Sequence, residues 1–202
     1  LLAYADCTGH GVPGAFMSMI GTTLLNDICA SENGLNPGEI LERLDTQLIN
    51  ILNKKGEAEV SDGMDVAIIS YNPASRSLQI AGARRPVYLI KQGNVTEIKG
   101  TKRSIGEREE KSRQNRFETK EIVVGKGDTL YMCSDGIADQ FGGQDNEYPN
   151  GKRLKSVGLK KMLVELNRLT IAEQQTAIEK MYEEWKGTCY QVDDVSIIGL
   201  RF

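Results

Sequence analysis

The chain has 202 residues, a length that suits one domain with a sizeable core, so we expect residues 1–202 to form a single domain. Hydrophobic residues make up 40% and charged residues 26%, and a net charge of −3 gives no electrostatic reason to expect a nucleic acid partner. No apolar stretch approaches the roughly 18 residues of a membrane helix and no signal-peptide pattern is present, which predicts a soluble, cytoplasmic protein.

Two helices are expected after a short first strand. Residues 1–5 are apolar and strand-like, and a glycine-rich turn follows. Apolar residues at helical spacing then predict a helix over about 13–30. Asn36 is a suitable N-cap and Pro37 a suitable first residue for a second helix. Its apolar face is expected to comprise Ile40, Leu41, Leu44, Leu48, Ile51 and Leu52.

Residues 60–133 contain short β-rich runs separated by turn residues, which predicts an antiparallel meander. The runs are MDVAIISY, SLQIAG, PVYLIK, VTEIK, KEIVV and DTLYMC. The segment 100–116 is charged and aperiodic, so we expect an exposed loop there.

Helical spacing returns after Asp135, and a last strand over 195–202 closes the chain. One apolar stripe consists of Leu159, Met162, Leu163, Leu166 and Leu169, and another of Ile171, Ile178, Met181, Tyr182 and Trp185. Several strands are apolar at consecutive positions, so both of their faces should be covered. The sequence therefore predicts an α+β fold with four layers (helix, sheet, sheet, helix) and mainly antiparallel sheets.

Neither the four cysteines nor the glycine motif gives good evidence for another class of protein. Cys7, Cys29, Cys133 and Cys189 form no C-x-x-C pair, so they predict neither a disulfide framework nor a zinc site. The stretch ADCTGHGVPGAF contains a G-x-G-x-x-G. A dinucleotide site needs this turn inside a βαβ unit, whereas here two successive helices and a meander follow. A nucleotide-dependent oxidoreductase therefore rests on the glycines alone.

Carboxylates at strand ends tell more about function. Asp6 follows an apolar strand, Asp135 follows TLYMCS, and Asp193 and Asp194 directly precede VSIIGL. Each could be a turn or helix cap taken singly. A cluster of three or four carboxylates, with no thiol or imidazole among its ligands, suits a hard-oxygen site for Mg²⁺ or Mn²⁺.

Five ordered blocks resemble the stage II sporulation protein E type of PPM phosphatases, the metal-dependent serine/threonine phosphatase superfamily. The blocks are ADCTGHGVPGAFMS, DGMDVAII, AGARRPVYLI, YMCSDGIADQFGG and QVDDVSIIGL, and the resemblance covers residues 1–202. It implies that Asp6 bridges two metal ions and that the backbone carbonyl of Cys7 is a further ligand. Asp135 and one residue of the aspartate pair, for which Asp193 is favoured over Asp194, would also bind metal.

The resemblance implies two-metal hydrolysis of phosphoserine or phosphothreonine by an activated water, with no protein nucleophile. His10 is a candidate general acid, although shaping the glycine turn is the favoured role. Asp62 is interpreted as a turn residue and Asp65 is left open. Contact of Arg84 and Arg85 with the substrate phosphate or with a partner's acidic surface is the alternative to the favoured interpretation, in which both are solvated charges at a strand end.

The family carries a further metal-binding acid on a strand before Asp6, and the chain opens on LLAYAD as if inside a domain. We therefore expect an N-terminally truncated fragment of a longer sensor phosphatase, with incompletely occupied metal sites and a sheet edge that could form a homodimer. The implied substrates are phosphorylated anti-sigma factor antagonists or related signalling proteins, and the whole protein could be membrane-tethered through its sensor. The competing hypothesis is a non-catalytic, partner-binding module with the same fold.

Overall fold

The computed structural model describes all residues except 10, 32–33, 54–62, 108–113 and 146. Its contacts divide the chain into two compact units, each made from two separate stretches. Unit 1 consists of Leu1–Pro86 and Lys99–Val124, and unit 2 consists of Val87–Ile98 and Gly125–Phe202. The chain therefore changes unit three times.

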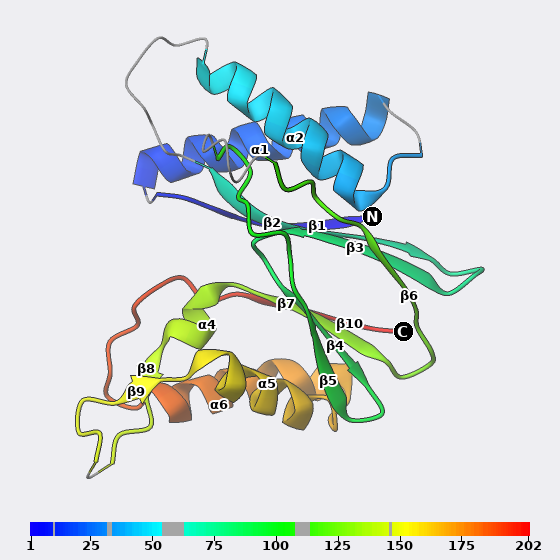
Figure 1. Ribbon diagram of the computed structural model, residues 1–202. Coiled ribbons are helices and arrows are strands. Elements are labelled where there is room, and N and C mark those ends of the chain that lie inside the picture. Colours follow the sequence, from blue (N-terminus) through cyan, green and yellow to red (C-terminus); the bar gives the residue numbers. More distant parts are fainter. Residues whose placement is uncertain (10, 32–33, 54–62, 108–113, 146) are drawn as a thin grey trace. The chain divides into compact units, whose positions relative to one another are not determined.

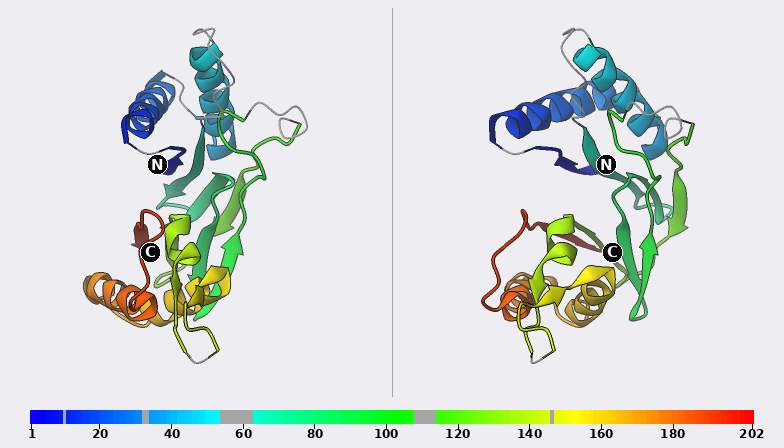
Figure 2. Two further views of the ribbon diagram at one scale, coloured as in Figure 1. Left: turned by 90° about the vertical axis from the view of Figure 1, so that its left-hand side faces the viewer. Right: turned by 60° about the vertical axis from the view of Figure 1, so that its left-hand side comes forward.

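Unit 1 is an antiparallel sheet with two helices on one face, as the views in Figures 1 and 2 agree. The strand order is β1-β2-β3-β6. The strands are β1 (Leu2–Cys7), β2 (Met64–Asn72), β3 (Ser77–Ala83) and β6 (Lys120–Val123), and the helices are α1 (Gly11–Ser31) and α2 (Pro37–Asn53). Apolar side chains of the two helices and of alternate strand positions form the core between these layers.

Helix α2 begins where the sequence predicts. The side chain of Asn36 accepts a hydrogen bond from the Glu39 backbone N–H at 3.1 Å, and the Glu39 carboxylate accepts one from the Asn36 N–H at 2.8 Å. This reciprocal pair satisfies two backbone donors that a helix start would otherwise leave unpaired. Leu41, Leu44 and Leu48 are then fully buried.

The segment between β5 (Asn94–Ile98) and β6 is not the wholly exposed loop that its charge predicts. Arg103 is 3% exposed, donates to the buried carboxylate of Asp45 on α2, and lies 4.6 Å from the centre of the Phe117 ring. The other Asp45 oxygen accepts the Gly106 N–H at 2.7 Å. A buried charge has to be paired, so this cluster fixes the described part of the segment to α2.

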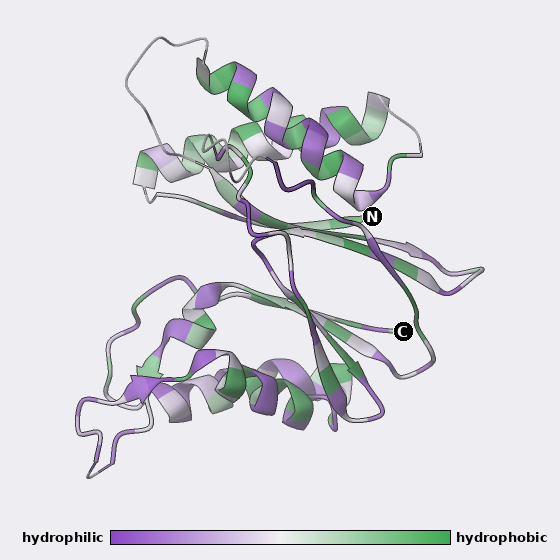
Figure 3. Ribbon diagram, in the orientation of Figure 1, coloured by the Kyte–Doolittle hydropathy of each residue, from purple (hydrophilic) through white to green (hydrophobic). Residues whose placement is uncertain are grey.

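Unit 2 combines a second antiparallel sheet with helices packed on one face (Figure 1). The strand order is β10-β7-β4-β5. The remaining elements are β4 (Val87–Lys91), β7 (Thr129–Cys133), α4 (Asp135–Asp139), the short ribbon β8 (Phe141–Gly142) and β9 (Lys152–Arg153), α5 (Lys155–Leu166), α6 (Ile171–Lys186) and β10 (Ile197–Arg201). Figure 3 shows hydrophobic residues along the strands and both kinds of residue along the helices.

Most positions of the two predicted helical stripes of unit 2 belong to its core or pack against it. Leu159, Leu163 and Leu166 of α5 and Ile178 of α6 are buried. Ile171 is 47% exposed because it is the first residue of α6. The ribbon β8–β9 has strands of two residues each, too short to show a period in the sequence.

The α+β class with antiparallel sheets is confirmed. Each unit supplies one helix layer and one sheet layer. Among the described residues, no helix has both the length and the apolar character needed to cross a membrane.

Candidate functional site

Asp6 lies on the face of the unit 1 sheet that is turned away from α1 and α2. Side chains alternate along a strand, and Ala3 and Cys7 pack against the core beneath these helices. The register partner of Asp6 in β2 is Asp65. Directly opposite residues of an antiparallel pair share a face, so two neighbouring carboxylates lie where β1 ends and β2 begins.

A buried arginine contacts Asp6. Nη2 of Arg85, just after β3, donates to Oδ2 of Asp6 at 2.7 Å, and the Arg85 side chain is only 5% exposed. The neighbouring Arg84 is 53% exposed and pairs with Glu107 at 3.3 Å. The interpretation as solvated charges is therefore right for Arg84 and wrong for Arg85, because adjacent residues in one turn point in different directions.

Asp65, whose role the sequence leaves open, is held by the segment that follows β5. The hydroxyl of Ser104 donates to Oδ1 of Asp65 at 2.6 Å, and the Ser104 N–H donates to Glu107 at 2.8 Å. An isolated β-bridge between Met64 and Ile105 holds the same segment beside β2. The carboxylate of Asp65 is therefore fixed by contacts within unit 1.

Asp135 is the first residue of α4, directly after β7, and its side chain is exposed. The preceding residue, Ser134, does not cap the helix with its side chain. Its hydroxyl instead donates to the Asp194 carbonyl at 2.9 Å and accepts the Ser196 N–H at 3.0 Å. Ser134 thereby connects the end of β7 to the segment that enters β10.

Asp193 and Asp194 lie directly beside the start of α4. A Cβ atom placed on Gly136 would be 2.3 Å from the Asp194 carbonyl oxygen and 3.3 Å from the Asp193 Cβ, so only glycine allows this approach. The Asp194 N–H donates to the Asp193 carboxylate at 2.7 Å. Unit 2 therefore places the backbone of the aspartate pair beside the start of α4, whose first residue is Asp135.

The four predicted ligands are distributed over both units. Asp6 and Cys7 belong to unit 1, and Asp135 and Asp193 belong to unit 2. In the part of the chain that the structure describes, no three histidine, cysteine or acidic side chains form a group that could hold a metal ion. The assembly of all four into one centre stays a prediction. His10 and Asp62 lie outside the described residues.

Gln140 has a structural role that no sequence pattern indicates. It is fully buried at the end of α4, and its amide donates to the carbonyls of Tyr190 at 2.8 Å and Phe141 at 2.9 Å. Its side-chain oxygen accepts the Tyr182 hydroxyl at 2.8 Å, and its backbone carbonyl accepts the Trp185 indole N–H at 3.2 Å. Gln140 thus joins α4, α6 and the segment leading to Asp193.

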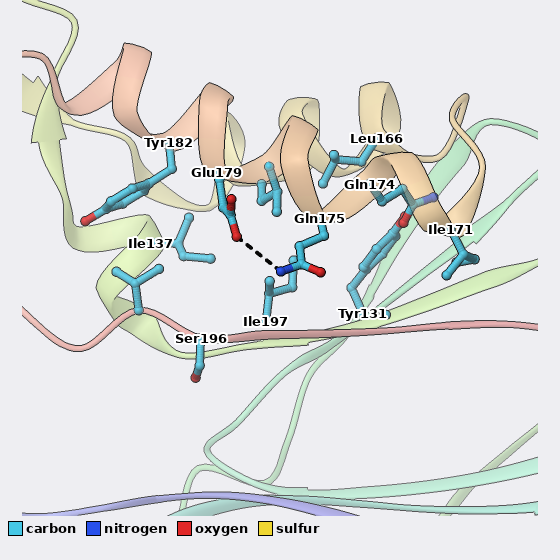
Figure 4. A pocket seen from close by; sticks show the side chains of 13 residues that line it. Tyr131, Ile137, Leu166, Ile171, Gln174, Gln175, Glu179, Tyr182, Ser196 and Ile197 are labelled. Carbon is cyan, nitrogen blue, oxygen red and sulfur yellow. Dashed lines mark hydrogen bonds between the residues drawn. The ribbon is translucent and has the colours of Figure 1, made fainter.

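Unit 2 also contains a mainly apolar pocket of about 510 Å³ between α6 and strands β7 and β10 (Figure 4). The hydroxyl of Tyr131 donates to Gln174 at 2.9 Å there, and burial raises the pKa of this phenol. Gln175 and Glu179 pair across one turn of α6. The candidate ligands Asp135 and Asp193 do not line it, so we assign the pocket no part in their chemistry.

The residues at the strand ends fit hard divalent cations. The side-chain donors at the predicted positions are carboxylate oxygens, and the exposure of Asp135 and Asp193 leaves them accessible from solvent. The Asp6 carboxylate already attracts one cation, the Arg85 guanidinium. This donor chemistry suits Mn²⁺ or Mg²⁺ and does not suit thiophilic metals.

The fold is that of the PPM class of serine/threonine phosphatases, which are hydrolases, as solved structures show. The SiaA-PP2C domain of Pseudomonas aeruginosa is 29% identical, with a TM-score of 0.84, and the match covers 99% of this chain and 74% of that one. The PP2C phosphatase domain of SpoIIE from Bacillus subtilis, with a fragment of its regulatory domain, is 19% identical, with a TM-score of 0.69 over 98% of this chain and 52% of that one.

The chain belongs to the stage II sporulation protein E (SpoIIE) family, whose sequence model matches residues 1–202. The catalytic domain of the phosphatase PstP, solved in complex with two manganese ions, shares the fold with 15% identity and a TM-score of 0.65, over 98% of this chain and 85% of that one. This chain spans only about half of the solved SpoIIE chain. No curated protein matches it significantly.

Proposed function

We propose that residues 1–202 act as a single metal-dependent phosphatase domain that hydrolyses phosphoserine or phosphothreonine on a bacterial signalling protein. The observation that carries the proposal is the close approach of the Asp193–Asp194 segment to Gly136, which places two acids beside Asp135 in a chain of the SpoIIE family. Carboxylate oxygens are the donors that Mn²⁺ and Mg²⁺ prefer in proteins. The placement of these acids beside the start of α4 therefore supports a metal-binding role.

We propose that Asp6, Asp135, Asp193 and the backbone carbonyl of Cys7 hold two Mn²⁺ or Mg²⁺ ions. When bound, the ions supply the Lewis acidity that activates a water for in-line attack and offsets charge on the phosphoryl oxygens. The role of the chain is to position: Ser134 and Gly136 fix the acids of unit 2, and the pairing of β1 with β2 fixes Asp6. Rigid positioning of this kind lowers the barrier for the reaction.

The proposal for the substrate has less support than the proposal for the reaction. SpoIIE-type chains are regulatory phosphatases, so we propose a phosphorylated protein such as an anti-sigma factor antagonist as substrate. We also propose that the domain works in the cytoplasm under an upstream sensor module and forms a homodimer. These assignments rest on the family and not on any residue contact in this chain.

The test compares Mn²⁺-dependent hydrolysis of p-nitrophenyl phosphate by the wild type, Asp135→Asn and Asp139→Asn. Asp139 is a matched control because it lies on the same short helix and pairs with Arg153 at 3.3 Å. We expect Asp135→Asn to lose at least about 100-fold in kcat/KM, since it removes a metal ligand, while Asp139→Asn keeps its activity.

Equal turnover in the wild type and Asp135→Asn would contradict the ligand assignment. A wild type that hydrolyses neither the small phosphoester nor a phosphoprotein, although it binds the phosphoprotein, would favour the partner-binding module instead.

A further inference from the structure

We propose that Arg85 is a built-in counter-ion of Asp6, which competes with divalent cations for this carboxylate and so sets how tightly the protein binds metal. The inference rests on the proposed function, in which Asp6 is a metal ligand. It assigns to Arg85 a positioning and affinity-setting role and no direct part in the chemistry.

The contact between the two side chains is short and largely shielded from water. Nη2 of Arg85 lies 2.7 Å from Oδ2 of Asp6, a distance typical of a charge-assisted hydrogen bond. The Arg85 side chain is 5% exposed, whereas that of Asp6 is 38% exposed. A buried guanidinium is strongly unfavourable without an anion, and the Asp6 carboxylate supplies one at hydrogen-bond distance.

The register of the sheet gives Arg85 a reason to be there. Asp6 and Asp65 are directly opposite each other in β1 and β2, and like charges at such positions destabilise a sheet. Asp65 accepts a hydrogen bond from the neutral Ser104 hydroxyl, which supplies no positive charge. The guanidinium at Asp6 therefore offsets the repulsion at this strand end in the metal-free protein.

The backbone is bent to aim Arg85 at this position. Arg84 adopts a φ of +53°, a left-handed conformation that a residue with a Cβ adopts only at a cost. The Arg85 N–H donates to the Ala83 carbonyl, which closes a tight turn directly after β3. A Cβ atom on Gly82 would be 2.4 Å from the Arg85 carbonyl oxygen. Glycine at 82 and strain at 84 together permit the turn that directs Arg85 inward.

Competition follows from the shared ligand atom. A divalent ion that binds Oδ2 of Asp6 has to approach the position that the guanidinium occupies, and the two cations repel each other at that distance. An opposite charge next to a carboxylate changes its affinity for a proton by about 10- to 1,000-fold. The same electrostatics applies to a metal ion, so removing the Arg85 charge should strengthen metal binding by about tenfold or more.

The experiment is isothermal titration of Mn²⁺ into the wild type, Arg85→Met, Arg85→Lys and Arg84→Met. Arg84→Met is the matched control, because it removes the same charge from the adjacent, exposed position. We expect Arg85→Met to lower the Kd for Mn²⁺ at least about tenfold and the other two variants to stay near the wild type. Thermal unfolding should show Arg85→Met less stable without metal and more strongly stabilised by Mn²⁺.

Arg85→Gln, which removes the charge but keeps a hydrogen-bond donor, is the second variant if Arg85→Met does not fold without metal. An unchanged or weaker Mn²⁺ affinity in the uncharged variant that folds overturns the inference. The proposed function is judged separately: it fails if Asp6→Asn binds Mn²⁺ as the wild type does, or if neither the wild type nor the uncharged variants bind Mn²⁺. In the latter case both proposals fail.

Discussion

Replacing Gly136 by alanine should push the Asp193–Asp194 segment away from the start of α4, which carries Asp135. The added Cβ would be 2.3 Å from the Asp194 carbonyl oxygen, and ordinary contacts begin at 3.4 Å, so one side has to move by roughly 1 Å. Alanine is otherwise the better helix residue at this position. We therefore expect the free energy of unfolding to fall by about 1–3 kcal/mol from overpacking alone.

The effect on activity should be larger than the effect on stability. A displacement of about 1 Å between catalytic groups can lower the rate by about 100-fold. The assay is Mn²⁺-dependent hydrolysis of p-nitrophenyl phosphate together with urea unfolding of the same preparations. Gly125→Ala is the control, because its added Cβ meets nothing closer than an Asp128 oxygen at 3.7 Å.

A Gly136→Ala protein with wild-type activity and stability would refute this reasoning. It would mean that the Asp193–Asp194 segment adapts freely, and that the close contact with α4 does not position the acids.

Two other substitutions probe how unit 2 is held together. Gln140→Leu leaves the Tyr190 carbonyl and the Tyr182 hydroxyl without their buried partner, so urea unfolding should show a loss of about 2 kcal/mol. Gln175→Leu, at an exposed residue of α6 that lines the open pocket, should show little loss. Hydrogen bonds from Thr170, the N-cap residue of α6, hold the pKa of Glu173 below its usual value. The stabilisation from this carboxylate is therefore present above the usual pKa and is lost as the pH falls through the lowered pKa. Glu173→Gln should lose less stability than the wild type on acidification, and equal losses in urea unfolding would contradict the assignment.

Local patterns in the sequence predicted most of the elements. The start of α2 at Asn36 and Pro37 follows from capping chemistry that involves residues three positions apart. The strands of both sheets follow from short apolar runs between turn residues. The neighbourhood of Asp135 and Asp193 was predicted from family motifs, and the hydrogen bonds of Ser134 give it a physical basis within unit 2.

Features that depend on distant partners could not be predicted in this way. Arg84 and Arg85 are the same residue type at adjacent positions, and the turn with a positive φ at Arg84 leaves one side chain exposed and the other buried. The contacts of Gln140 with Tyr182 and Tyr190 join residues more than forty positions apart. The buried position of Arg103 likewise depends on Asp45 of α2, and no residue pattern near Arg103 in the sequence indicates this distant partner.

The interleaving of the two units restricts how the chain can be divided. The β4–β5 hairpin of unit 2 is encoded between β3 and β6, which pair with each other in unit 1. A single cut after Val124 leaves unit 1 whole but takes this hairpin from unit 2, and an earlier cut divides unit 1 itself. Every single cut between Pro86 and Gly125 therefore divides at least one unit, so recombination at one such junction cannot exchange one unit and leave the other whole.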